Sequence, residues 1–163
     1  PDDIRRYIDS MESDIRDLDT LIEHMLTLSK MDYQESAPTP ENFRFADFLE
    51  EMLAAYQPIL DKKGLTLNLD IQDYGKAAQD KVLVKSIFSN LMDNAVKYTL
   101  PGTAIRVTAG TVSPKGLEFS VANPCAPIAQ KDLDRLFDPF FRLSGHPAKG
   151  TGLGLTIAQK LVA

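Results

Sequence analysis

The chain has 163 residues, a length that suits one medium domain or a small domain with an appended helix. Hydrophobic residues make up 44% of it and charged residues 25%, which are ordinary globular values and argue against disorder. No apolar run approaches the roughly 18–20 residues that span a bilayer, so we expect any membrane anchor to lie elsewhere in a longer parent protein. The single cysteine, Cys125, excludes an intramolecular disulfide and a cysteine-based zinc cluster.

The net charge of −5 is unevenly distributed along the chain. Residues 1–36 carry ten acidic and four basic side chains, whereas residues 37–163 carry thirteen acidic and fourteen basic ones. The acidic excess therefore belongs to the first segment. Neither segment forms the basic stripe that nucleic-acid binding requires, so we expect no nucleic-acid partner.

The first segment, residues 1–36, is predicted to be a long amphipathic helix. Its apolar residues alternate at spacings of four and three over three heptads, with charges between them, which is an a/d register. A lone helix cannot bury such a face, so we expect self-association in a helical bundle through residues 1–33, with an intramolecular helical layer as the alternative. The register is formed by Ile4, Ile8, Met11, Ile15, Leu18, Ile22 and Met25.

The run Ala37-Pro38-Thr39-Pro40 breaks this helix and starts a second segment, residues 37–163. Helices and strands alternate there without strict βαβ repetition, so we expect an α+β fold with a mixed sheet and helices on one face. The expected elements are an extended piece at 43–45, helices at 46–62, 80–98, 130–136 and from 151 onward, a strand at 65–71, and a hairpin of strands at 105–109 and 117–121. Turns are expected at 74–75 and 113–116, and Asp80 is the expected N-cap of the helix at 80–98.

Three glycines at spacing two open the last predicted helix in the run Gly150-Thr151-Gly152-Leu153-Gly154-Leu155. Glycine lets a backbone approach a phosphate closely, and the first amides of a helix offer free donors to an anion. A glycine-rich turn packed on the sheet is the alternative. The dinucleotide-binding fingerprint is excluded because no strand leads directly into the run.

A polar stripe lies on the helix predicted for residues 80–98. Asn90, Asn94 and Lys97 are spaced i, i+4 and i+7, so two amides and an ammonium share one face. Amide oxygens suit Mg²⁺, and lysine offers a point charge to phosphate. The alternative is a merely solvated face, but asparagines are poor helix formers and two of them inside a helix are unexpected for that purpose. The stripe therefore favours a phosphate and metal site over a merely solvated face.

Three motifs together resemble those of sensor histidine kinases. Residues 88–99 resemble the N box of that family, Phe137-Asp138-Pro139-Phe140-Phe141-Arg142 its F box, and 150–155 its second glycine box, in the family's order. Residues 1–33 resemble the second helix of the family's dimerisation and phosphotransfer bundle. The resemblance thus covers nearly the whole chain.

The resemblance implies a Bergerat-type ATP-binding two-layer α/β sandwich that transfers the γ-phosphoryl group of ATP to a histidine. It implies Mg²⁺ as a second cofactor, a response regulator as a partner, a phosphoacceptor helix from the same or a partner subunit, and a cytoplasmic position in a bacterial inner-membrane sensor. Arg142 and Lys97 are the implied catalytic residues and Asn94 the metal ligand. The implied nucleotide-binding residues are Asn90, Asn94, Lys97, Tyr98, Asn123, Ile128, Phe137, Arg142, Thr151, Gly152, Leu153 and Gly154, with a short lid at 143–149.

The first glycine box of the family, Asp-x-Gly-x-Gly, is altered. Aligned on Val121 and Ile128, its place is taken by Asn123-Pro124-Cys125-Ala126-Pro127. The asparagine oxygen can still accept a hydrogen bond from the adenine amino group, but without the charge that strengthens it. We therefore expect weaker nucleotide binding than is usual for the family, by about 1 kcal/mol or more.

Two further departures concern the histidines and the end of the chain. His24 lies in the second-helix match and is expected to be solvated or packed in the bundle, while His146 is expected in the lid. The phosphoacceptor histidine and the final strand pair of the family are therefore expected to lie outside this sequence. Two alternatives to the kinase remain open: a degenerate module that docks a response regulator or partner without productive ATP binding, and another ATPase of the same superfamily.

Overall fold

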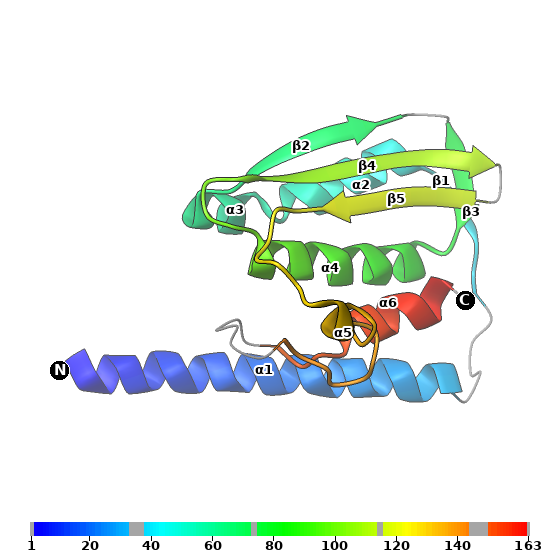
Figure 1. The fold of residues 1–163 in the computed structure, drawn as a ribbon. Coiled ribbons are helices and arrows are strands. Elements are labelled where there is room, and N and C mark those ends of the chain that lie inside the picture. Colours follow the sequence, from blue (N-terminus) through cyan, green and yellow to red (C-terminus); the bar gives the residue numbers. More distant parts are fainter. Residues whose placement is uncertain (1, 33–37, 73–74, 114–115, 144–149, 163) are drawn as a thin grey trace. The chain divides into compact units, whose positions relative to one another are not determined.

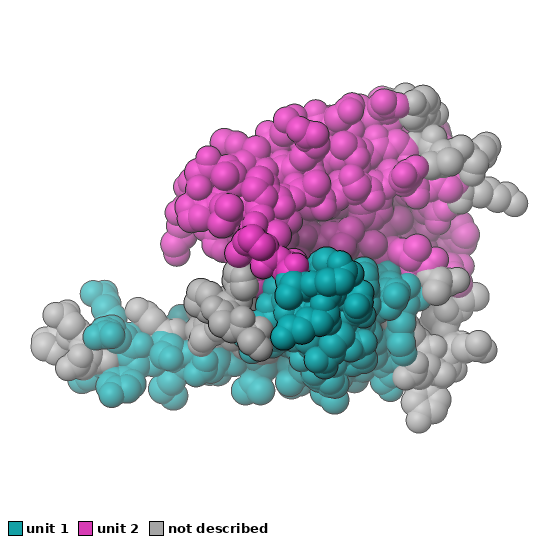
Figure 2. Space-filling view, viewed as in Figure 1, with its two compact units in different colours: residues 1–37, 129–161, 163 teal, residues 38–128, 162 magenta. Residues whose placement is uncertain are grey.

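A computed structural model of the chain describes residues 2–32, 38–72, 75–113, 116–143 and 150–162. Its contacts divide the chain into two compact units (Figure 2): the first holds residues 1–37, 129–161 and 163, and the second holds 38–128 and 162. The division of the sequence into a helical segment, residues 1–36, and a catalytic domain, residues 37–163, remains a prediction.

The second unit is built on a mixed sheet of three strands (Figure 1). The central strand pairs in parallel with one neighbour, in the register Leu67 to Ile105, and antiparallel with the other, in the register Val107 to Val121. A separate two-stranded antiparallel sheet pairs Phe43 with Ala77. The larger sheet has the order β2-β4-β5, with β2 at Thr66–Ile71, β4 at Ala104–Ser113 and β5 at Gly116–Ala122; the smaller joins β1 at Glu41–Arg44 to β3 at Lys76–Gln79.

One face of the larger sheet is buried and the other faces solvent. Ile105 and Val107 of β4 are fully buried, whereas Arg106 between them is exposed and Thr108 shares an exposed hydroxyl contact with Ser120 at 2.8 Å. Helices pack on the buried face, and the expected α+β fold with a mixed sheet is confirmed. These helices are α2 at Phe45–Ala54, α3 at Gln57–Lys63 and α4 at Lys81–Tyr98.

The core of the second unit is a single cluster of buried apolar side chains. Phe88 of α4 is fully buried and meets Phe119 of β5 edge to face, with ring centroids 5.7 Å apart. The apolar side chains that recur at helical and strand spacing in the sequence thus pack against one another and hold the helices to the sheet. Other fully buried members are Leu49, Leu60, Met92, Ile105 and Val107.

Helix α4 begins at a side-chain cap, as predicted. The carboxylate of Asp80 accepts hydrogen bonds from the amides of Val82 at 2.9 Å and Leu83 at 3.2 Å, and its other oxygen accepts from the amide of Thr39 at 2.9 Å. The hydrogen bond from Thr39, followed by those from the two helix amides, lowers the pKa of this carboxyl below its ordinary value.

Three elements differ from the sequence prediction, and the helix expected from 151 onward begins only at Gly154. The single helix expected at 46–62 is two helices, α2 and α3, because Pro58 lies in the first turn of α3 and cannot continue a preceding helix. Strand β3 was not predicted, since its four residues are too few to display a period. The helix expected at 130–136 is the single turn α5 at Gln130–Leu133. Residues 74, 114 and 115 of the expected turns lie outside the described residues.

The first unit contains α1 at Asp2–Asp32, α5, and all but the last residue of α6, which spans Gly154–Val162. The long first helix is confirmed, and the seven apolar residues of its heptad register are between 50% and 66% exposed. Such a face is costly to leave in water, so it is suited to a further helix. Across the described parts of the chain, no helix combines the length and apolar character needed to cross a membrane.

Candidate functional site

The predicted polar stripe lies on the last three turns of α4 in the second unit. Asn90 is buried and its Nδ2 donates to the carbonyl of Ser86 at 2.9 Å, so its amide group is held against the helix. Asn94 is half-buried and Lys97 exposed one turn further on, and Tyr98 is half-buried at the end of the helix. The side chains of Asn94 and Lys97 can therefore be reached from solvent.

The chemistry of this stripe suits Mg²⁺ that arrives with phosphate. Within the described ranges, no group of three or more His, Cys, Asp or Glu side chains could hold a metal ion by itself. Mg²⁺ keeps several waters and commonly takes one or two protein oxygens together with substrate phosphates. The amide oxygen of Asn94 fits that limited role, with Lys97 three residues away as a charge for phosphate.

A contact that the sequence did not predict anchors the same stretch of α4. The hydroxyl of Tyr56, at the corner between α2 and α3, donates to Oδ1 of Asp93 at 3.0 Å. Burial, and then the charge of Asp93, raise the pKa of Tyr56 far above its usual range, so the hydroxyl stays a donor. The residue before Asn94 is thereby tied to a different helix, and no motif in the sequence signals that pairing.

The segment after β5 is held to the end of α4 within the second unit. The amide of Leu100 donates to the carbonyl of Pro124 at 2.9 Å. The hydroxyl of Thr99, which is buried beside it, donates a hydrogen bond to the carbonyl of Ala95 at 2.5 Å. The altered first glycine box, Asn123 to Pro127, therefore starts beside the end of the N box, and Ile128, which follows it, is half-buried.

Asn123 carries a buried polar atom without a partner. Its Nδ2 is out of contact with solvent and has no hydrogen-bond acceptor among the residues that the structure describes. A buried donor left unpaired costs about 1–3 kcal/mol, so native structures keep few of them. The residue that the sequence predicts to meet the base therefore carries a buried donor with no partner among the described residues.

In the first unit the F box and the second glycine box are in direct contact. The amide of Phe140 donates to the carbonyl of Gly152 at 3.0 Å. Gly152 has φ of 73°, and a Cβ placed on it would lie 2.7 Å from the carbonyl carbon of Phe140 and 2.8 Å from the carbonyl oxygen of Phe141. Only glycine fits here, which explains in physical terms why this motif needs its central glycine.

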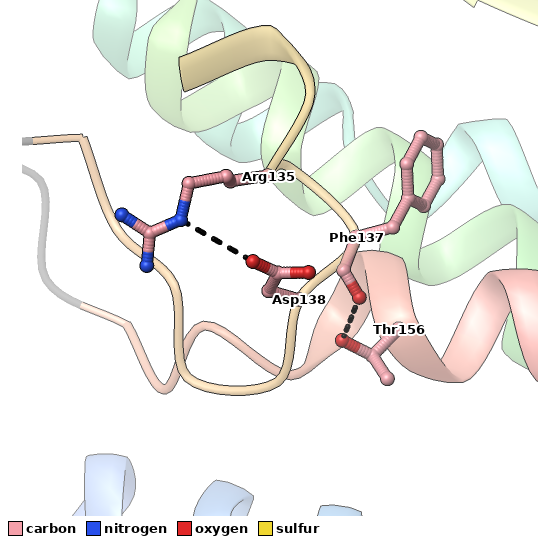
Figure 3. Close-up of polar contacts among 4 residues, drawn as sticks. All are labelled: Arg135, Phe137, Asp138 and Thr156. Atoms are coloured by element: carbon pink, nitrogen blue, oxygen red, sulfur yellow. Dashed lines mark hydrogen bonds and ion pairs between the residues drawn. The ribbon is translucent and has the colours of Figure 1, made fainter. Parts of the chain in front are cut away.

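Two side-chain contacts fix the F box further (Figure 3). The buried hydroxyl of Thr156 on α6 donates to the carbonyl of Phe137 at 2.9 Å, and Nε of Arg135 lies 3.3 Å from Oδ2 of Asp138. The guanidinium of Arg135 also stacks 4.6 Å from the ring centre of Phe141. Neither Arg135 nor Thr156 was predicted, although the position of each beside a motif could have suggested a supporting role.

The hydroxyl of Thr151 joins the glycine box to α1 within the first unit. Its Oγ1 accepts from the amide of Leu153 at 3.3 Å and lies 3.1 Å from Nδ1 of His24. The expectation of a solvated or bundle-packed His24 did not include this contact, because nothing in the helical pattern points toward residue 151. His146 and lid residues 144–149 lie outside the described residues, while Arg142, the F-box residue directly before the lid, is exposed.

Comparison with known proteins identifies the family. The model of the histidine kinase-, DNA gyrase B- and HSP90-like ATPase family matches residues 79–163, from the cap of α4 through the glycine box. The chain belongs to this family, and its fold is the Bergerat-type ATP-binding fold that the motifs predicted.

Relatives within the family point to one class. The sensor histidine kinase CusS of Escherichia coli O157:H7 is 31% identical over 145 residues, which cover 87% of this chain and 30% of CusS. The histidine kinase AdeS of Acinetobacter baumannii superposes with a TM-score of 0.77 at 26% identity, over 95% of this chain and 71% of that one. The predicted resemblance to sensor histidine kinases is confirmed, and this chain spans about a third of the length of CusS.

A third structure shares the fold at lower identity. The histidine kinase ThkA, solved in complex with the response regulator TrrA, has a TM-score of 0.72 at 20% identity and covers 99% of this chain and 44% of ThkA. At that identity the likeness concerns the fold alone. It extends over α1 as well as the ATP-binding fold.

Proposed function

We propose that the chain binds ATP with Mg²⁺ and transfers the γ-phosphoryl group to a histidine on a helix outside this sequence, for relay to a response-regulator aspartate. The observation that carries the proposal is the hydrogen bond between Phe140 and Gly152, which joins two motifs of the family in one loop arrangement. Membership of an ATPase family and similarity to sensor histidine kinases support it. A cytoplasmic position follows from the same proposal, because ATP is the substrate.

The roles in binding follow the chemistry of each side chain. The amide oxygen of Asn94 would hold Mg²⁺, with Asn90 beside it, and the ion would supply positive charge against the phosphates. Lys97 and Tyr98 would contact the phosphates or ribose, while Asn123 would meet the base. The remaining proposed contacts are Ile128 and Phe137 toward the nucleotide, and Thr151, Gly152, Leu153 and Gly154 around the phosphate chain.

The chemical step would exchange one bond to phosphorus for another. The bond between the γ-phosphorus and the bridging oxygen breaks, a bond to an imidazole nitrogen forms, and ADP leaves while the imidazole loses a proton. Arg142 and Lys97 would stabilise the charge on the transferred group, since a guanidinium and an ammonium both donate hydrogen bonds to phosphate oxygens and carry positive charge. Because the Leu153 amide is bonded to Thr151 Oγ1, a phosphate oxygen would compete with that hydroxyl for it.

The exposed heptad register of α1 supports a homodimer through residues 1–33, with the phosphoacceptor helix completing the bundle. Sizing the chain with and without residues 1–33 tests this. The full chain is expected to be a dimer and the shortened chain a monomer. A monomer in both forms would contradict the proposed self-association.

Calorimetry with the non-hydrolysable analogue AMPPNP and Mg²⁺ tests the nucleotide proposal. We expect measurable binding by the chain, loss of the Mg²⁺-dependent part in Asn94→Ala, and no change in the control Asn68→Ala on exposed strand β2. No heat at millimolar AMPPNP would favour the degenerate docking module. Binding that ignores Asn94→Ala would overturn only its metal role.

A further inference from the structure

The buried Nδ2 of Asn123 is the feature of the molecule that the proposed function uses least. The family's carboxylate at this position can only accept hydrogen bonds, whereas a carboxamide carries one acceptor and one donor. In this chain the donor is the atom that is buried without a partner among the described residues. A ligand that satisfies it must present a hydrogen-bond acceptor.

The backbone of Asn123 is held in place on both sides. β5 ends at Ala122, directly before it, and its last residues are in register with β4 through Ala122 and Arg106. On the other side, Pro124 has a fixed φ and its carbonyl accepts from Leu100 at 2.9 Å. The backbone of Asn123 is thus clamped between a strand end and a loop, which leaves the side-chain torsions as the degrees of freedom of this residue.

We infer that Asn123 makes the base end of the site accept 6-oxopurine triphosphates, such as ITP and GTP, as well as ATP; this rests on the proposed nucleotide function. Adenine presents an amino donor at C6 beside the acceptor N1, and the amide matches both with Oδ1 and Nδ2. A 6-oxopurine presents the reverse order, a carbonyl acceptor beside an N1–H donor. A half-turn of the amide about its last bond matches that edge equally well, since its oxygen and nitrogen are nearly isosteric.

A carboxylate cannot make this exchange. It accepts a hydrogen bond from the adenine amino group. Opposite a 6-oxopurine, however, its acceptor oxygens face the carbonyl oxygen of the base, and the repulsion between them disfavours that base. Replacing the carboxylate by Asn123 removes the repulsion and adds a donor. Asn123 is therefore a specificity-determining residue, and its effect is relaxed discrimination among purines.

Calorimetry with β,γ-imido analogues of ATP and ITP, each with Mg²⁺, decides the question. The two ligands differ only at the base edge, so the ratio of their dissociation constants isolates it. We expect the unmodified chain to bind the ITP analogue within about tenfold of the ATP analogue, and Asn123→Asp to widen the ratio about tenfold or more. Asn68→Asp makes the same chemical change at an exposed position of β2 and should leave the ratio unchanged.

The possible results distinguish failure of this inference from failure of the proposed ATP binding. An adenine preference of about thirtyfold or more in the unmodified chain overturns the inference and leaves ATP binding standing, whereas failure of both analogues to bind overturns both. The unmodified chain alone is enough to decide between these outcomes, even should Asn123→Asp not fold. A 1-deaza ATP analogue, which lacks the N1 acceptor, checks the donor: it should bind the unmodified chain about fivefold more weakly than its parent, and equal binding contradicts the role of Nδ2.

Discussion

The second unit and the first unit hold their residues in place by different means. In the second, buried apolar side chains from both layers form one cluster, and Phe88, Ile105 and Val107 have no exposed surface. In the first, the F box and glycine box are joined by single polar and backbone contacts, such as Phe140 to Gly152 and Thr156 to Phe137. The apolar register of α1 is more exposed than buried.

This difference separates stability from positioning. Truncating a side chain in a packed core lowers the free energy of unfolding by the lost transfer free energy plus a term that grows with the cavity left behind. A loop held by a few directional contacts loses little free energy when one is broken, but the atoms it positions move. Changes in the apolar core of the second unit should therefore be read as stability, and loss of the polar contacts of the F box and glycine box as changes in local order and ligand geometry.

The largest effect is expected from Phe88→Ala. Phe88 is fully buried, so its truncation leaves a cavity between α4 and the sheet and should lower the free energy of unfolding by about 3–5 kcal/mol. Urea denaturation followed by circular dichroism measures it. Val82→Ala on the same helix, where the side chain is 74% exposed, should change stability by no more than about 0.5 kcal/mol. Similar losses in both variants would contradict the proposed core.

Gly152→Ala probes the first unit by a clash. Both Gly152 and Gly102 have φ of 73°, but a Cβ on Gly102 meets nothing within 4 Å, whereas one on Gly152 meets the backbone of Phe140. Gly102→Ala should cost about 1–2 kcal/mol from the left-handed conformation alone, and Gly152→Ala about 1–3 kcal/mol more. Hydrogen exchange at the Phe140 amide should accelerate about tenfold or more in Gly152→Ala only. Equal behaviour of the two variants would mean that the loop absorbs the clash.

The sequence was most informative where a period or a motif extends over several residues. The helix at 80–98, its cap at Asp80 and the hairpin were predicted because apolar spacing and turn chemistry agree there. The N, F and glycine boxes were found because each is a local string. The prediction of one helix at 46–62 was wrong because the apolar spacing outweighed Pro58, whose first-turn position in a second helix leaves the pattern unbroken.

Contacts between distant residues could not be predicted from a single sequence. His24 and Thr151 are 127 positions apart, and Tyr56 and Asp93 are 37 apart. Each pair depends on how whole elements pack, and neither residue type is unusual in its own segment. The same holds for the buried Nδ2 of Asn123: the substitution is visible in the sequence, but its lack of a partner is visible only in the structure.

Asp80→Ala is expected to have an intermediate effect. It removes the acceptor for two helix amides and for Thr39, and the loss of such a cap costs about 1–2 kcal/mol. Because the pKa of Asp80 is lower in the folded chain than its ordinary value of 3.8, its contribution is present above that pH and lost as pH falls through the folded pKa.

The matched control for that pH dependence is Asp80→Asn, which keeps an acceptor oxygen but cannot titrate. Comparing urea midpoints at pH 7 and pH 3 should show a larger fall for the unmodified chain than for Asp80→Asn, since other carboxyls titrate equally in both. An equal fall would mean that Asp80 is not linked to folding through its proton.

The smallest effect is expected from Arg135, where exposure limits what any contact can contribute. Its side chain is 59% exposed and that of Asp138 55%, so their ion pair should be worth no more than about 1 kcal/mol and should fade with added salt. Stacking of the guanidinium on Phe141 is much less sensitive to salt.

Two substitutions separate the stacking from the ion pair. Arg135→Lys keeps the positive charge and loses the planar stack, whereas Asp138→Asn keeps the stack and loses the negative charge. If stacking orders the F box, Arg135→Lys should accelerate exchange of the Phe141 amide at low and high salt alike, whereas the effect of Asp138→Asn should vanish at high salt. The reverse pattern would assign the order of the loop to the ion pair, and the first unit would then weaken with ionic strength while the apolar core of the second would not.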